Sequence, residues 1–360
     1  MKNKFFLLVA AVLVMTMLAG CAGTVVVVGD CTCPVEGHTE NAPTETTQPS
    51  VGDGETALKT GLAVSTKISD SASATADKAG AAAYDITIAA VTVDDNGVIR
   101  SCKVDSVPAT VNFGADGVIT TDLATVIDTK NEKGENYGMV AWGGAIAEWD
   151  AQVAALCDFA VGKTVAELKS GAVSESGYAP EGTDLASSAT IYLGSYVAVI
   201  EAAVNNAQHL GAIDGDELKL VTLNSIASSV SATAEKAGTA QLDANIAVVT
   251  VRDGVISSCI IDAVQAKISF DTTGTITTDL TAAVSTKNEL GEGYGMKAWG
   301  GAIAEWNEQA ASFAAYVTGK TAAEVAGIAV TEGKPSDADL AASVTIAIGD
   351  FQGLIAKALG

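Results

Sequence analysis

The sequence predicts an α+β fold made of two tandem copies of a small domain, in which an antiparallel sheet packs on helices. The first observation is an internal repeat, because Thr129–Gln152 returns as Thr286–Gln309 with 19 of 24 positions identical. The second is a pair of β-branched runs around a glycine turn in each copy, and the third is a helical apolar pattern further along each copy. We expect repeat domain 1 at 56–206, a linker at 207–215 and repeat domain 2 at 216–360.

Each copy is expected to begin with a β-hairpin. The dipeptides Asn96-Gly97 and Asp253-Gly254 separate β-branched runs, and both are strong signals of a hairpin turn. Further turn residues downstream predict a second hairpin at 110–121 in the first copy and at 267–278 in the second.

Apolar residues at spacings of 4, 3, 4 and 3 predict one helix of about five turns in each copy. All four tryptophans of the chain lie on this apolar stripe, which we expect to face the core, with a cofactor-stacking role as the alternative. Gly162 and Gly319 are expected to end the helices in the left-handed conformation. The stripe comprises Trp142, Ile146, Trp149, Val153 and Leu156 in the first copy, and Trp299, Ile303, Trp306, Ala310 and Phe313 in the second.

A Gly-Lys-Thr sequence follows each of these helices. A nucleotide-binding P-loop requires another glycine five residues earlier, where Cys157 and Ala314 stand instead. The segments Thr164–Glu167 and Thr321–Glu324 have the T-x-x-E pattern of a capping box, which predicts the start of a short second helix.

The last segment of each copy predicts a further helix, Asp184–Val204 and Asp339–Leu359, with the aspartate as N-cap. Small hydroxyl residues follow the aspartate in the first copy. The free N–H groups and the positive dipole end of such a helix favour a phosphate group.

Composition excludes several classes of function. Lys and Arg number 20 against 43 Asp and Glu, for a net charge of −23, so a nucleic-acid partner is not expected. With two histidines in the chain, a His-based metal site or catalytic triad has little support, and we assign no metal ligand and no catalytic residue. Cys102 and Cys259 occupy equivalent hairpin positions, as expected of buried free thiols.

The N-terminus has the features of an export signal. Two lysines precede an apolar stretch of 14 residues, Phe5–Leu18, which is too short to span a bilayer comfortably. The sequence Leu18–Cys21 resembles the lipobox of bacterial lipoproteins, which implies a signal peptide at 1–20 and a lipid anchor on Cys21. An ordinary secretory signal is the alternative. Residues 21–55, rich in Pro, Thr, Glu and Gly, predict a disordered tether. We therefore expect a cell-membrane location on the extracytoplasmic face.

The order of these parts resembles the extracytoplasmic FMN-binding domain of redox-pump subunits and flavinylated lipoproteins. That family has a D-x-x-S-G-A-T motif, which Asp184–Thr190 matches with Ser188 in place of the glycine. The second copy, Asp339–Thr345, departs further, because Val344 replaces the alanine. The segments Glu132–Met139 and Glu289–Met296 are similar to the family's E-T-P-G-x-G loop without the proline.

The resemblance implies FMN joined to a threonine through a phosphoester, installed by a flavin transferase, and electron transfer from a membrane redox donor. It implies that Thr190 and Thr345 carry the cofactor and that each motif aspartate caps the helix and orients the hydroxyl. The other residues it places at the cofactor are Ser187, Ser188, Tyr137, Gly138, Met139 and Asp184 in the first copy, and Ser343, Tyr294, Gly295, Met296 and Asp339 in the second. An electron carrier or binding protein is favoured over a turnover enzyme. The alternative function is a non-catalytic lipoprotein that binds a small ligand, a glycan or a protein partner.

Overall fold

The structure, a computed structural model, describes residues 55–360, which belong to one compact unit. The predicted signal peptide, the lipidation site Cys21 and the predicted tether up to residue 54 lie outside the described residues. Among the helices of residues 55–360, none is long and apolar enough to cross a membrane.

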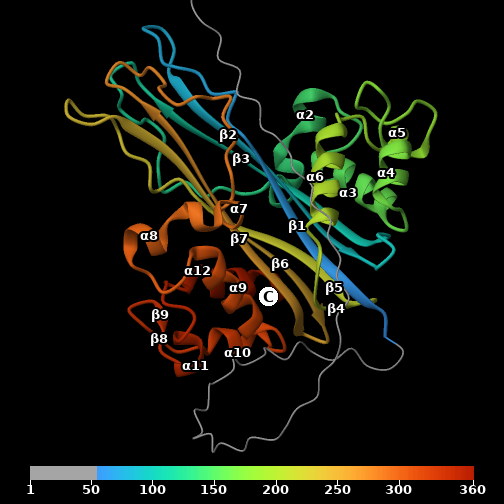
Figure 1. Ribbon diagram of the computed structural model, residues 1–360. Coiled ribbons are helices and arrows are strands. Elements are labelled where there is room, and N and C mark those ends of the chain that lie inside the picture. Colours follow the sequence, from blue (N-terminus) through green and yellow to red (C-terminus); the bar gives the residue numbers. More distant parts are fainter. Residues whose placement is uncertain (1–54) are drawn as a thin grey trace, which may run out of the picture. The chain divides into compact units, whose positions relative to one another are not determined.

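The described chain is a mixed α/β structure with antiparallel sheets, as the sequence predicts at that level (Figure 1). A four-stranded sheet has the order β3-β2-β1-β4, a three-stranded sheet has the order β5-β6-β7, and β8 pairs with β9. The strands of the first sheet are β1 (Ala57–Lys67), β2 (Gly80–Val93), β3 (Ile99–Phe113) and β4 (Gln208–Ile213). The others are β5 (Glu217–Ser225), β6 (Gly238–Arg252), β7 (Val255–Phe270), β8 (Val330–Thr331) and β9 (Lys334–Pro335).

The first hairpin of each copy is confirmed, as β2–β3 and β6–β7. Asp253 (φ +52°) and Gly254 (φ +77°) both have the positive φ that a tight hairpin turn requires. The second hairpins are confirmed only as short turns. Phe113 bridges Ile119, and the N–H groups of Gly114 and Thr120 donate to the carbonyls of Val118 and Asn112. No separate strand follows the turn, while the long alternating pattern of β3 stays paired with β2 as far as Phe113.

The segment expected to be a linker, 207–215, contains strand β4. It pairs antiparallel with β1, where Ala57 is opposite Ile213, and the N–H of Asp214 donates to the carbonyl of Thr56. Ala212 and Ile213 are buried, which explains why this short apolar stretch is held on the sheet.

The helical segments follow one another in the same order in both copies. The capping boxes at Thr164 and Thr321 are confirmed, so each Gly-Lys-Thr joins two helices. The first copy has α1 (Lys130–Lys133), η1 (Gly134–Tyr137), α2 (Met139–Gly143), α3 (Trp149–Ala160), α4 (Val165–Ala172), α5 (Asp184–Ser188) and α6 (Gly194–Asn205). The second has α7 (Lys287–Leu290), η2 (Gly291–Tyr294), α8 (Met296–Gly300), α9 (Trp306–Val317), α10 (Ala322–Ala326), α11 (Ala338–Ala341) and α12 (Gly349–Leu359).

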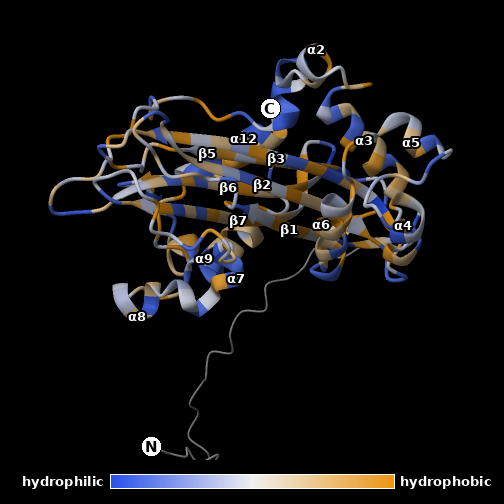
Figure 2. Cartoon of the chain, turned by 90° about the horizontal axis from the view of Figure 1, so that it is seen from above, coloured by the Kyte–Doolittle hydropathy of each residue, from blue (hydrophilic) through white to orange (hydrophobic). Residues whose placement is uncertain are grey.

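Both larger sheets have apolar residues on their two faces, and both faces are covered (Figure 2). One face of β1–β3 packs on α3 and α6, and one face of β6–β7 packs on α9 and α12. The remaining faces pack against each other in a shared core, where the rings of Phe113 and Phe270 stack with centroids 4.1 Å apart. Helices α3 and α9 are thus packed on the sheets, and their first turns carry two side chains that organise the candidate site.

Candidate functional site

The predicted tryptophan helix is two helices in each copy. α2 ends at Gly143, Gly144 adopts a left-handed conformation (φ +62°), and α3 begins only at Trp149. Trp149 is buried as expected, but Trp142 is 90% exposed and its counterpart Trp299 is 89% exposed. The expectation that all four tryptophans face the core is therefore wrong. The two glycines after each exposed tryptophan interrupt the helix, and the predicted apolar stripe is lost there.

A glutamate at the start of α3 holds the loop that contains Tyr137, Gly138 and Met139. The carboxylate of Glu148 accepts the N–H groups of Met139 (2.8 Å) and Val140 (2.9 Å). In the second copy Glu305 accepts the N–H groups of Met296 (2.8 Å) and Lys297 (3.0 Å) in the same way. These glutamates satisfy the free N–H groups of α2 and α8 and fix each loop on the following helix.

The glycine of this loop lies directly under the exposed indole. Gly138 has φ +83°, and a Cβ built there would stand 2.2 Å from Cδ1 of Trp142. Gly295 and Trp299 repeat the arrangement, with the same φ and the same 2.2 Å. One part of each indole therefore covers the glycine backbone, while most of its surface faces solvent.

The predicted helix Asp184–Val204 is also broken. Its first part is α5 and its second part is α6, and Thr190 lies in the loop between them. The N-cap of α5 is Thr183, not Asp184. In the second copy the N-cap of α11 is Asp337, not Asp339, and Thr345 lies between α11 and α12. The predicted position of each threonine near the mouth of a long helix is therefore wrong.

A buried glutamine explains why the helix breaks at this point. Oε1 of Gln152, on α3, accepts the N–H groups of Thr190 (2.8 Å) and Ile191 (3.2 Å), which a continuous helix would bond within itself. The Thr190 hydroxyl donates to the same oxygen at 3.3 Å. Gln309 makes the three equivalent bonds to Thr345 and Ile346, at 2.8, 3.2 and 3.2 Å. Gln152, and not Asp184, therefore orients the hydroxyl.

Glu148 and Gln152 stand four residues apart at the start of α3, so they lie on one face of the helix. Glu148 holds the loop of residues 137–139 and Gln152 holds the loop of Thr190, so the same turn of α3 contacts both predicted segments.

The motif hydroxyls differ in exposure and in partners. Thr190 is exposed and Thr345 is partly exposed. The hydroxyls of Ser187 and Ser188 instead donate to the carbonyl of Asp184 within α5. Ser343 likewise donates to Leu340 in the second copy.

A buried lysine lies beneath the aromatic loop. Lys130 is 5% exposed, and its Nζ lies 5.5 Å from the ring centroid of Tyr137 and 5.2 Å from that of Trp149. Asp85 pairs with it at 3.1 Å. Burial, the largest influence, lowers the pKa of Lys130, but Asp85 and neighbouring phenols outweigh it, so the pKa lies above its usual value. In the second copy Lys287 lies 5.0 Å from the ring of Tyr294.

Two side chains that organise this site were not predicted from the sequence. Both belong to an E-W-x-x-Q sequence, Glu148–Gln152, which returns as Glu305–Gln309 in the second copy. A polar pair kept in both copies beside a core tryptophan was the available signal, because a fully buried glutamine needs dedicated hydrogen-bond partners.

Three cysteines in the described residues are buried and reduced: Cys102, Cys157 and Cys259. The hydrogen bond with Cys157 and then burial raise the pKa of Cys102, and burial raises the pKa of Cys259 to about 12. Thiols of this kind are unreactive at neutral pH. Within residues 55–360 no group of three or more His, Cys, Asp or Glu side chains could hold a metal ion.

No protein-family model, curated protein or solved structure matches this chain.

Proposed function

We propose that this chain is a lipoprotein, anchored through Cys21 on the extracytoplasmic face, whose two repeats are copies of one FMN-carrying domain. Each would hold FMN on its motif threonine, Thr190 or Thr345, and the protein would transfer electrons outside the cytoplasm. The resemblance to the FMN-binding domain supports the cofactor, and the lipobox-like sequence supports the anchor.

One observation carries the proposal. In both repeats the first turn of one helix holds a threonine hydroxyl through a buried glutamine, and through a glutamate it holds the short helix that carries an almost fully exposed indole. Leaving a tryptophan in water forfeits the favourable burial of a large aromatic surface. Two tryptophans exposed at equivalent positions are therefore best explained by a planar partner that stacks on them, and isoalloxazine is such a partner.

The backbone at position 188 can accommodate serine, the residue by which the first motif departs from the family pattern. Ser188 stands where the family has glycine, and among the described non-glycine residues only Asp253 and Glu332 have positive φ. A serine at position 188 is therefore unstrained. Val344 is fully buried, as is its counterpart Ala189, so that position fills the core behind the loop and does not face a ligand.

The residues of the chain would have distinct roles. Thr190 would provide the oxygen of the phosphoester, losing its proton as AMP leaves the FAD donor of the transferase. Gln152 would hold that oxygen at the surface, and the loop fixed by Glu148 would place Tyr137 and Trp142 beside the ring. Lys130 would supply a fixed positive charge below the loop. The flavin itself supplies the redox chemistry, which the protein tunes by position and electrostatics.

The test is the intact mass of the protein co-expressed with a flavin transferase. We expect a yellow protein that carries one FMN per repeat, with Thr190→Ala and Thr345→Ala each removing one. Thr183→Ala is the matched control, because that hydroxyl is also exposed in the same segment but caps α5. A colourless protein of unmodified mass would contradict the proposal.

A second candidate is a non-catalytic binding lipoprotein. The exposed Trp142 and Ile146, with Trp299 and Ile303 in the second copy, favour it, because such a surface also stacks on the apolar face of a sugar. In the same experiment this function predicts no flavin, and a loss of glycan binding in Trp142→Ala.

A further inference from the structure

A cavity of about 680 Å³ lies between strands β1 and β4 on one side and β7, α7 and α9 on the other. Its volume is within the range of small-molecule sites in proteins. It contains neither Thr190 nor Thr345, so a ligand in this cavity is independent of the proposed flavin.

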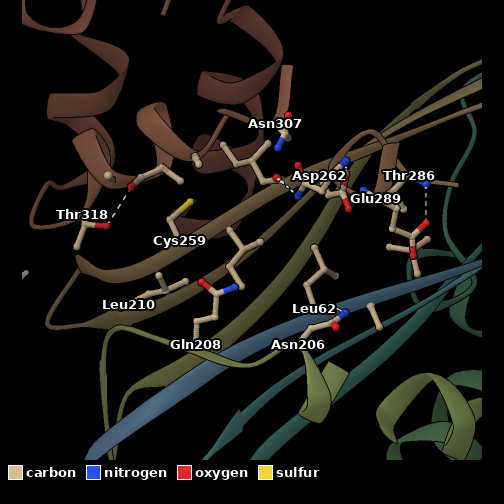
Figure 3. A pocket seen from close by; sticks show the side chains of 18 of the residues that line it. Leu62, Asn206, Gln208, Leu210, Cys259, Asp262, Thr286, Glu289, Asn307 and Thr318 are labelled. Atoms are coloured by element: carbon tan, nitrogen blue, oxygen red, sulfur yellow. Dashed lines mark hydrogen bonds between the residues drawn. The ribbon is translucent and has the colours of Figure 1, made fainter. Parts of the chain in front are cut away.

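The two carboxylates of the lining, Asp262 and Glu289, lie at one end of this cavity. Figure 3 shows Asp262, Glu289 and Asn307 there, whereas Leu210 and Cys259 lie toward the other end. Among the described residues that line the cavity none is Lys or Arg. The imidazole that lines it, His209, is bonded to Asp95 at 3.0 Å.

Asp262 is a carboxylate fixed in place at the polar end. It is 5% exposed, and its Oδ1 accepts the N–H groups of Ala263 (2.7 Å) and Asn288 (3.0 Å). Burial raises its pKa to about 6, although the Thr286 hydroxyl and these N–H groups lower it. Near neutral pH Asp262 is therefore negatively charged. Hydrogen-bond donors stabilise this charge, and the cavity lining offers no lysine or arginine to pair with it.

A second acceptor at this end has no partner. Oδ1 of Asn307 is buried and lacks a hydrogen bond, which costs about 1–3 kcal/mol for a polar atom of this kind. The rest of the lining carries no carboxylate and includes apolar side chains such as Leu62, Leu210 and Ile260. A ligand with a hydrogen-bond donor at the acidic end and an apolar body therefore matches this lining.

We infer that this cavity binds a small organic cation, with an ammonium or amidinium group among Asp262, Glu289 and Asn307 and an apolar body toward Leu210 and Cys259. A cation would donate hydrogen bonds to these acceptor oxygens and neutralise the carboxylate charge. An anion would instead be repelled by two carboxylates, with no lysine or arginine in the lining to balance it. The net charge of −23 adds a field that attracts cations.

The first repeat offers a matched control for Asp262. Asp105 is its counterpart, also buried, and its Oδ1 accepts the N–H groups of Ser106 (2.7 Å) and Asn131 (3.1 Å). The local structural role is the same, but Asp105 does not line the cavity. The variants Asp262→Asn and Asp105→Asn therefore separate ligand binding from the shared local role.

The test is calorimetric titration of the full mature chain with tryptamine, its neutral analogue tryptophol and the anion indole-3-acetate at pH 7.5. We expect tryptamine to bind with one site per chain, tryptophol at least 10-fold more weakly, and indole-3-acetate not at all. Asp262→Asn should weaken tryptamine at least 10-fold, and Asp105→Asn should leave it unchanged.

A second cavity variant keeps the test decisive if Asp262→Asn fails to fold. Ala311 lies on the exposed side of α9 and lines the cavity, so Ala311→Phe should fill the cavity while circular dichroism stays that of the wild type. We expect it to abolish tryptamine binding. The inference is overturned if tryptamine shows no binding at concentrations up to about 1 mM, which corresponds to weak affinity. It is also overturned if tryptophol binds as tightly as tryptamine, or if either cavity variant binds tryptamine like the wild type. Two tryptamine sites per chain would overturn it as well.

Discussion

The two repeats place their loops in the same way but differ in what lies beneath and beside them. The first helical turn in one is capped at Gly134 with φ 46° and ψ −124°, and in the other at Gly291 with φ 48° and ψ −123°. Yet Asp85 pairs with Lys130, whereas its counterpart Asp243 instead accepts the amide of Gln241 at 2.7 Å. The two repeats therefore share their backbone geometry here, while the charged partners beneath the loops differ.

The largest expected effect separates the two tryptophans within one repeat. Trp149 is 3% exposed and its indole N–H donates to the Tyr196 hydroxyl at 2.9 Å, so Trp149→Ala should lower the free energy of unfolding by about 3–5 kcal/mol. Trp142→Ala should change it by less than about 0.5 kcal/mol, because that side chain is exposed. Urea unfolding of the variants, with Trp306→Ala and Trp299→Ala as the second pair, measures both. Equal costs within a pair would mean that the indole of Trp142 is buried in solution.

The second effect tests whether the glutamine holds the loop equally in both repeats. Gln152→Ala leaves the N–H groups of Thr190 and Ile191 without their acceptor and removes a buried side chain, which should cost about 2–4 kcal/mol in urea unfolding. Gln309→Ala should cost the same within about 1 kcal/mol, because its bonds are the same. Hydrogen exchange at residues 190–191 and 345–346 should accelerate in the matching variant alone. Unchanged exchange would contradict the role of the glutamine.

The third expected effect is a pH dependence of the free energy of unfolding that comes from Asp262. Its pKa is raised from 3.8 to about 6, so the folded state holds this proton more tightly than the unfolded state does. Stability should therefore fall as the pH rises through the window from about 4 to 6, by about 3 kcal/mol for this group. Burial raises the pKa of Asp105 as well, which gives a loss of the same sign in the first repeat.

The measurement is the free energy of unfolding from pH 3.5 to 7.5 for the wild type and for Asp262→Asn. Glu289, which also raises the pKa of Asp262, stays in both proteins, as do Thr286 and His209. The wild type should lose about 3 kcal/mol relative to the variant over that range. A constant difference between the two proteins would show that the carboxyl titrates normally.

Local sequence signals predicted most of the elements but not the breaks between them. The hairpin turn at Asp253-Gly254 and the capping box at Thr164 depend on neighbouring residues, and both were predicted. The breaks at Thr190 and after Gly143 depend on Gln152 and Glu148, which accept N–H groups from segments 38 and nine residues away. Helical periodicity continues across such positions because it does not detect a distant acceptor.

The same reason explains what was missed at the candidate sites. The position of Trp142 on an apolar stripe predicted burial, and only the two glycines after it indicated otherwise. The cavity at Asp262 could not be predicted, because its walls come from strand β1 of the first repeat, from β4 in the segment between the repeats, and from helix α9 of the second repeat. Strands β1 and β5 were not predicted either, although the turn residues Asp214-Gly215 stand just before β5.

Strand β4 and the shared core have a practical consequence for dissecting the molecule. A fragment ending at residue 206 would leave the start of β1, Ala57–Thr60, without its partner strand, and it would also expose the apolar face that Phe113 presents to Phe270. Bare strand edges beside apolar faces are templates for aggregation. Studies of one repeat at a time should therefore inactivate the other by point substitution within the whole chain rather than by truncation.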